Sequence, residues 1–242
     1  KYLKNNNDNN FKKKFIYNEK SYSYNNIYLP KNKDIFLTGY FQSYKYFWKN
    51  INLLKNYFCI NYELIKHLKK KINKININNK KILAIHVRLT DYIDKKNFHL
   101  NLSLDYYKNA LSYFNTDNYL IILFSDDIKE AKQFLKPLKL NMIDSTYFND
   151  NSEDEKIFML LSICPNKICC NSSYSLFSCY FNDIYNFNDK CLNIFPNNWF
   201  GIDGPEYNIN DLIPENNNYL ILQEYLTNKI KINNNSMYLK DK

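Results

Sequence analysis

Short apolar runs alternate with amphipathic segments through the middle of the chain. Residues 81–88 and 119–124 are nearly continuous apolar runs, which suit parallel strands buried on both faces. The segments that follow them carry apolar residues at helical spacing. This alternation predicts an α/β fold with a doubly wound, mostly parallel sheet. The expected strands are 35–37, 81–88, 119–124, 140–143, 167–170 and 191–195, and the expected helices are 46–58, 62–72, 104–114, 128–135, 153–164, 175–181 and 219–230.

Local composition divides the chain into four regions. Residues 1–34 are rich in Asn and Lys, which is typical of a loop or a poorly ordered lead-in. Residues 35–80 form a mostly helical region with a polar linker, and residues 81–200 form the α/β domain. Residues 201–242 are expected to form a loop and a C-terminal helix. The chain begins with Lys, so we expect it to be a piece of a longer protein. The upstream sequence would decide whether that protein is cytoplasmic or is associated with the Golgi membrane.

The charge of the chain is unevenly distributed between lysine and arginine. The formal net charge is +9, and Arg88 is the one arginine among the 33 basic residues. This charge fits either a solvated lysine-rich surface or attraction to phosphates. Arginine presents a planar fork of donors that binds phosphate oxygens in pairs, which lysine does not reproduce. Arg88 therefore becomes the first candidate for a phosphate-binding residue.

The sequence disfavours a membrane span, a zinc site and an RNA-recognition module. No run of about 18 uncharged apolar residues occurs, which argues against a membrane span in this chain. None of the six cysteines makes a C-x-x-C pair, so a zinc site is not expected. The basic residues do not show the aromatic–basic pattern of an RNA-recognition module either.

Three polar clusters, at residues 86–92, 125–127 and 171–175, lie at the carboxyl ends of three of the expected strands. Ligands of open α/β sheets bind outside the carboxyl ends of the strands, where these clusters would meet. In the first cluster, His86 and Arg88 share one face of the strand because side chains alternate with period two. The structural alternative to phosphate binding by Arg88 is an ion pair with Asp91. For His86, the structural alternative is a hydrogen-bonded histidine in the core.

The second and third clusters each precede an expected helix. Asp126 and Asp127 are suited to accept hydrogen bonds from ribose hydroxyls or a guanine edge, and the alternative is that Ser125 or Asp126 caps the helix. Backbone N–H groups at the start of the following helix would bind phosphate oxygens, and simple capping is again the alternative. The candidates in the third cluster are Asn171, Ser172, Ser173 and Ser175.

The order and spacing of these clusters resemble the motifs of the α-1,2-fucosyltransferases, a glycosyltransferase family 11-like group. Residues 86–92 resemble the family's His-Val-Arg-Arg-Gly-Asp-Tyr, residues 124–127 its Phe-Ser-Asp-Asp, and residues 171–177 its Asn-Ser-Ser-Phe-Ser-Trp-Trp. Residues 39–43 resemble its Gly-Tyr-Phe-Gln segment, and residues 196–199 its Pro-x-x-Trp. Together the five segments extend over most of the chain.

The resemblance implies a GT-B-like fold, GDP-L-fucose as the donor, a galactose-containing glycan as the acceptor, inversion at the anomeric carbon and no required metal. It implies that Arg88 binds the β-phosphate and that Asp126 and Asp127 help to hold the nucleoside. His86 and Asp91 are the other catalytic candidates, with Asp91 either orienting Arg88 or lying near the acceptor. The residues implied to line the phosphate and fucose end are Asn171, Ser172, Ser173 and Ser175.

The chain departs from the family pattern at several positions. Leu89 and Thr90 replace an Arg and a Gly, and Leu176 and Phe177 replace the two Trp. The family's N-terminal Gly-rich segment is missing, so residues 35–80 resemble a remnant of the acceptor-side domain. The alternatives are therefore a degenerate, non-catalytic nucleotide-sugar or glycan-binding module, a related transferase with another donor and, from a different class, a nucleic-acid-binding protein.

Overall fold

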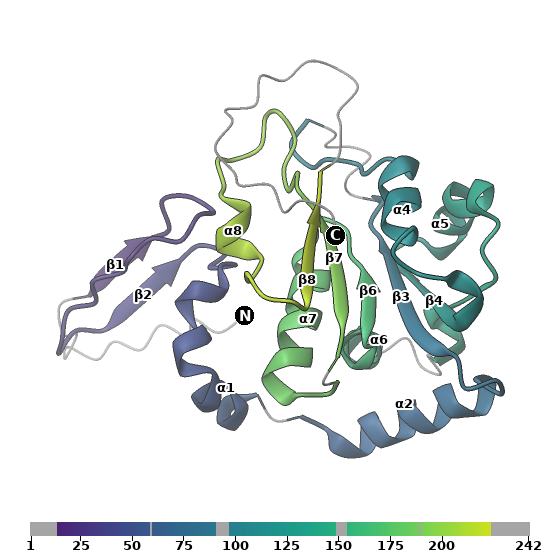
Figure 1. Ribbon diagram of the computed structural model, residues 1–242. Helices are drawn as coiled ribbons and strands as arrows, with labels where there is room; N and C mark the ends of the chain where they lie inside the picture. The colour runs from purple at the N-terminus through teal and green to yellow at the C-terminus, as the bar shows by residue number, and fades with distance from the viewer. Residues whose placement is uncertain (1–13, 59, 91–96, 149–153, 189, 224–242) are drawn as a thin grey trace.

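A six-stranded parallel sheet forms the centre of the molecule, in the order β5-β4-β3-β6-β7-β8 (Figure 1). The computed structural model describes residues 14–58, 60–90, 97–148, 154–188 and 190–223. The strands of this sheet are β3 (Lys81–Val87), β4 (Tyr119–Ser125), β5 (Met142–Asp144), β6 (Asn166–Ile168), β7 (Leu192–Pro196) and β8 (Tyr219–Leu222).

Helices cover both faces of the sheet. Successive side chains of a strand point to opposite faces, so an apolar strand gives the sheet two apolar faces that helices bury. Leu83 and Ile85 of β3 pack with α4 (Leu104–Leu111) and α5 (Ile128–Leu135) on one face. Ala84, which lies between them, packs with α2 (Tyr62–Ile75) and α6 (Asp154–Ile163) on the other. A third cluster joins α7 (Ser173–Tyr185) to Phe195 of β7 and to side chains of α1 (Ile51–Tyr57) and α8 (Ile209–Leu212). The doubly wound, GT-B-like α/β fold predicted from the sequence is confirmed.

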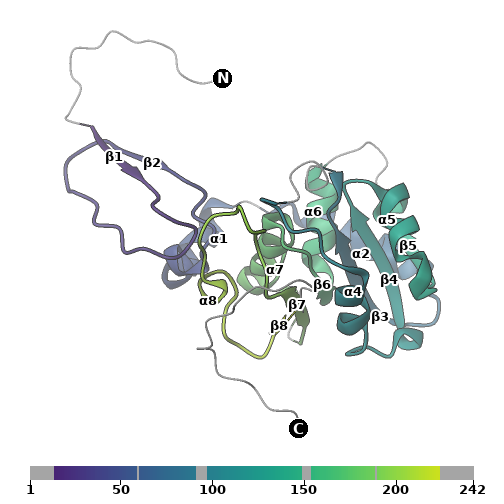
Figure 2. The same cartoon turned by 90° about the horizontal axis from the view of Figure 1, so that it is seen from above.

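Strands β1 (Phe15–Asn18) and β2 (Ile35–Thr38) form a separate two-stranded ribbon that extends away from the central sheet (Figure 2). β1 lies in the lead-in and pairs in parallel with β2. The helix predicted from residue 46 begins as two 3-10 turns, Tyr44–Tyr46 and Trp48–Asn50, and becomes α-helical only in α1.

The prediction of a C-terminal helix from residue 219 is wrong, because this segment begins with strand β8. Leu220 of β8 pairs with Ile194 of β7, and Ile221 pairs with Phe195. A short apolar run fits a buried strand and a buried helix equally well by periodicity, and here pairing with β7 decides. Residues 224–230 of that prediction lie outside the described residues. The other strands and helices predicted along the sheet are confirmed, α5 at both ends and the rest with shifted ends.

Candidate functional site

Arg88 directly follows β3, at the carboxyl edge of the central sheet. Its side chain is 34% exposed, whereas His86, two residues earlier, is buried at 5% exposure. The buried strand thus ends in a guanidinium group that is partly open to solvent. This position agrees with the location at which parallel α/β sheets bind ligands.

Asp126 joins the segment after β3 to the end of β4. Its carboxylate accepts hydrogen bonds from the backbone N–H groups of Leu89 and Thr90, both at 3.0 Å, and from the Thr90 hydroxyl. The Nε atom of Arg88 lies 3.2 Å from Oδ2 of Asp126. Val87 and Ser125 are register partners, so the two strand ends lie side by side. Asp126 therefore orients Arg88 and holds the chain that follows it.

The environment of Asp126 favours its ionised form. The side chain is 13% exposed, and burial by itself would raise the pKa of the carboxyl. The hydrogen bonds from Thr90 and Leu89 and the charge of Arg88 outweigh burial and lower this pKa below its ordinary value. Asp126 is thus a fixed anion beside the Arg88 cation.

Asp127 serves a different structural purpose from its neighbour. Its carboxylate accepts a hydrogen bond of 3.0 Å from the N–H of Glu130 and caps α5. Its own N–H donates to Oγ of Ser125 at 3.1 Å. The capping alternative is therefore seen at Asp127, and not at Ser125 or Asp126, where the cap was expected.

His86 and Ser175 connect the first and third sequence clusters inside the protein. Nδ1 of His86 is hydrogen-bonded to Oγ of Ser175, which is fully buried, and lies 3.3 Å from Sγ of Cys170. Burial and the charge of Arg88 lower the pKa of His86 to about 4. Burial raises the pKa of the Cys170 thiol to about 12. Near neutral pH the group is therefore uncharged, and it anchors the end of β3 to the first turn of α7.

The third cluster divides into residues that hold the backbone and one that faces solvent. Ser172 caps α7 by accepting from the N–H of Tyr174 at 3.3 Å. The Asn171 side chain is buried and donates to the carbonyls of Leu100 and Trp199, both at 2.9 Å. Ser173, the first residue of the helix, is exposed.

The structure thus brings Arg88, Asp126, His86 and Ser175 together across β3, β4 and α7, while Asp127 caps a helix beside them. Asp91 lies outside the described residues. Sequence reasoning missed Cys170 beside His86 and the Thr90 hydroxyl on Asp126. The replacement of a family Gly by Thr90 was a visible signal, because a hydroxyl supplies a hydrogen bond that Gly lacks.

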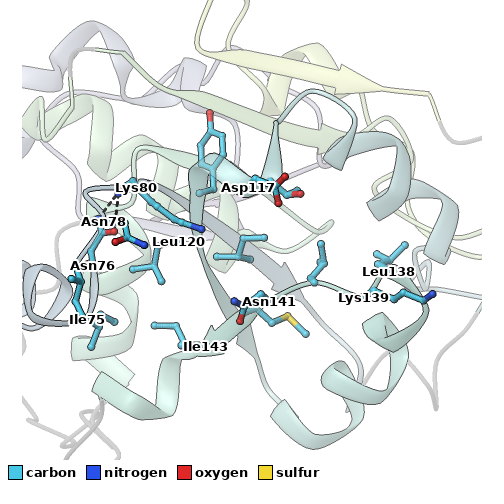
Figure 3. Close-up of a pocket in the computed structure, with 16 residues that line it drawn as sticks. Ile75, Asn76, Asn78, Lys80, Asp117, Leu120, Leu138, Lys139, Asn141 and Ile143 are labelled. Carbon is cyan, nitrogen blue, oxygen red and sulfur yellow. Dashed lines mark hydrogen bonds between the residues drawn. The ribbon is translucent and has the colours of Figure 1, made fainter.

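A cavity of about 410 Å³ lies at the opposite edge of the sheet (Figure 3). It is formed by the segments that lead into β3, β4 and β5. Labelled side chains around it include Asn78, Lys80, Asp117, Lys139 and Asn141. It is therefore distinct from the cluster around Arg88, which carries the motif residues. The candidate site is the cluster around Arg88, because its charged side chains suit a ligand and the cavity lacks the motif residues.

Comparison with known proteins identifies the group to which these motifs belong. The family model described as glycosyl transferase family 11 matches residues 1–201. The chain belongs to glycosyl transferase family 11. A relative from Escherichia coli, described as O-antigen biosynthesis glycosyltransferase WbnK, is 30% identical over 203 residues. That match takes in 78% of this chain and 63% of the relative. The motif resemblance found in the sequence is therefore confirmed at the level of the family.

Proposed function

We propose that this chain binds GDP-L-fucose at the carboxyl edge of its sheet and takes part in transferring L-fucose to a galactose-containing glycan, as a galactoside α-1,2-fucosyltransferase. Membership of glycosyl transferase family 11 supports glycosyl transfer as the reaction class. The observation that carries the proposal is the Arg88 guanidinium, partly exposed and oriented by Asp126 where β3 ends. A charged fork at this position suits a diphosphate.

In the proposed reaction, the acceptor hydroxyl oxygen attacks the anomeric carbon of fucose from the face opposite GDP. The bond between this carbon and the β-phosphate oxygen breaks, GDP leaves with the electron pair, and the configuration inverts. Arg88 stabilises the negative charge that develops on the departing diphosphate. A base accepts the proton of the acceptor hydroxyl, and we propose Asp91 for this role if it lies near the acceptor.

The remaining candidates support the donor site in different ways. The exposed N-terminus of α7 at Ser173 is suited to an anionic sugar phosphate because of its N–H groups and the helix dipole. Asp126 and Asp127 line the side of the proposed site that receives the nucleoside. For His86 and Ser175 we propose positioning in place of direct contact, because both are buried and hydrogen-bonded to each other.

Isothermal titration calorimetry with GDP, GDP-fucose and UDP tests the donor site. We expect GDP and GDP-fucose to bind and UDP to bind more weakly. Arg88→Lys should lower the affinity for GDP by about tenfold to 100-fold despite keeping the charge, because a bidentate charge-assisted contact is lost. Lys139→Ala, which removes a cation at the opposite edge of the sheet, is the matched control. Equal losses in the two variants would refute a specific role for Arg88.

The proposed reaction does not require a metal ion. We expect transfer to continue in excess EDTA, with turnover measured by release of GDP from GDP-fucose in the presence of a galactoside. Loss of turnover that added Mg²⁺ or Mn²⁺ restores would contradict this part of the proposal.

A second candidate function, nucleotide-sugar binding without transfer, is favoured by Leu89. The family motif has a second Arg here, whereas Leu89 packs against the hydrophobic core beside β3. GDP-fucose binding that depends on Arg88, together with absence of both transfer and donor hydrolysis, would identify this function. Measurable transfer would exclude it.

A further inference from the structure

Helix α2 carries a basic stripe on the side that faces away from the sheet. Lys66, Lys70 and Lys74 follow one another at a spacing of four residues, and all three are exposed. A helix advances about 100° per residue, so the stripe lies opposite the buried side chains of α2. Those buried side chains are Ile65, Leu68 and Ile72.

The stripe is unfavourable for the helix itself. Like charges four residues apart repel each other and destabilise a helix. Glu63 is the one acidic residue of α2, whereas the helix contains five lysines. Within the part of the chain that the structure describes, Lys66, Lys70 and Lys74 take no part in a salt bridge. An external anionic surface would relieve this repulsion.

Exposed apolar side chains lie on α1 and at the start of α2, the helix that carries the stripe. Leu53 and Tyr57 lie one turn apart on α1 and are 56% and 81% exposed. Tyr62, the first residue of α2, is 68% exposed and stands four residues before Lys66 in the same row. Figure 1 places the end of α1 beside the start of α2, on the lower side of the molecule.

We propose that this α1–α2 corner, defined as Leu53, Tyr57, Tyr62, Lys66, Lys70 and Lys74, docks on an anionic lipid bilayer. Lysine ammonium groups bind headgroup phosphates, while tyrosine rings and an aliphatic side chain enter the interface between headgroups and acyl chains. Among the described residues, no helix is long and apolar enough to cross a bilayer. The proposed docking is peripheral, because it uses side chains on the surface of α1 and α2.

The lipid surface is favoured over a nucleic acid by the apolar half of the corner. Phosphates of either partner attract the lysines. A bilayer also offers an apolar region to an exposed leucine and a tyrosine one turn away, and a sugar–phosphate backbone does not. In Figure 1 the corner lies toward the opposite side of the sheet from the strand ends that lead to Arg88. Docking therefore leaves the donor site accessible, and changes in the corner should not alter affinity for GDP.

Co-sedimentation of the full chain with vesicles tests the charge of the corner. We expect binding to phosphatidylcholine vesicles that contain phosphatidylglycerol, weak binding to phosphatidylcholine alone, and loss at high salt. The triple variant Lys66→Gln, Lys70→Gln and Lys74→Gln should lower partitioning by at least about tenfold, since each lysine near an anionic surface contributes roughly fivefold. Lys108→Gln, Lys129→Gln and Lys136→Gln remove the same charge from exposed positions on α4 and the α5 region, and should have a much smaller effect.

Fluorescence tests insertion without removing a lysine. Tyr57→Trp should show a blue shift of emission on anionic vesicles, whereas Tyr147→Trp, at an exposed site 55% accessible elsewhere, should not. Equal loss of vesicle binding in the two lysine triples would overturn the proposal, because binding would then follow net charge alone. No shift at residue 57, or preference for RNA over vesicles at equal phosphate, would overturn it as well.

Discussion

The two edges of the central sheet are built differently, although the same strands form both. At the carboxyl edge, the Asp126 carboxylate after β4 pairs with the Arg88 guanidinium after β3. The same carboxylate accepts hydrogen bonds from the N–H and the hydroxyl of Thr90. At the amino edge, the contacts involve neutral groups, as between Asn76 and the backbone of Lys80 and between the Asn166 amide and the Ile82 carbonyl. The amino edge has the cavity, but the carboxyl edge has the fixed charges. A site for a diphosphate depends on the second property more than on the first.

The largest expected effect concerns protonation of His86 behind the carboxyl edge. Its pKa is about 4 when folded against about 6.5 when unfolded, so the unfolded chain binds more protons between these values. The contribution of His86 to the free energy of unfolding is therefore fully present above about pH 6.5. It is lost as the pH drops toward 4, which lowers this free energy by on the order of 3 kcal/mol. Urea unfolding at several pH values measures this slope.

His86→Gln is the variant that isolates this contribution. It should be less stable at neutral pH and should show a flatter dependence on pH between about 4 and 6.5. His67, on the exposed side of α2, gives the matched control in His67→Gln. An unchanged slope in His86→Gln would show that other groups cause the acid sensitivity.

The second effect separates orientation from simple charge at the carboxyl edge. Asp126→Asn removes a negative charge beside a proposed anion site, which alone would strengthen GDP binding. We expect weaker binding by about tenfold, and a loss of about 1–2 kcal/mol in the free energy of unfolding, because Arg88 and Thr90 lose a charged partner.

Calorimetry and urea unfolding measure these two changes. Asp117→Asn makes the same charge change at the exposed amino edge and should leave GDP affinity and stability nearly unaltered. Tighter GDP binding by Asp126→Asn would show that Asp126 acts only through its charge.

The smallest effect is expected at the amino edge. The Asn76 side chain donates to the Lys80 carbonyl at 2.7 Å and accepts from the Lys80 N–H at 2.9 Å. Asn76→Ala should therefore cost about 1 kcal/mol of stability and leave GDP affinity unchanged. A change in GDP affinity would mean that the two edges are coupled through β3.

Much of the sheet could be predicted because its strands are continuous apolar runs, as at β3 and β4. Helix α5 is confirmed at both ends, since a capping acid precedes its apolar face. Prediction failed at β8, where the apolar run Tyr219–Leu222 is too short for periodicity to distinguish a strand from a helix. The 3-10 turns before α1 were missed because their apolar spacing imitates a longer helix.

The candidate site was predictable in its members but not in their connections. Arg88 stood out as the one arginine, and Asp126 as an acid after a strand. Their ion pair was not visible, because no local pattern connects residues that follow two different strands. The burial of Ser175 against His86, residues 89 positions apart, was not visible either.

The sequence by itself determined the α/β class, the family and the residues that carry charge at the ends of strands. These properties are written in local patterns of apolar spacing and in short motifs. The tertiary structure decided which residues face solvent and which hold others in place, as at Arg88 and His86 on the same strand. It also decided that the last strand joins β7. Burial and pairing between distant segments depend on the packing of the whole chain, and no local pattern encodes that packing.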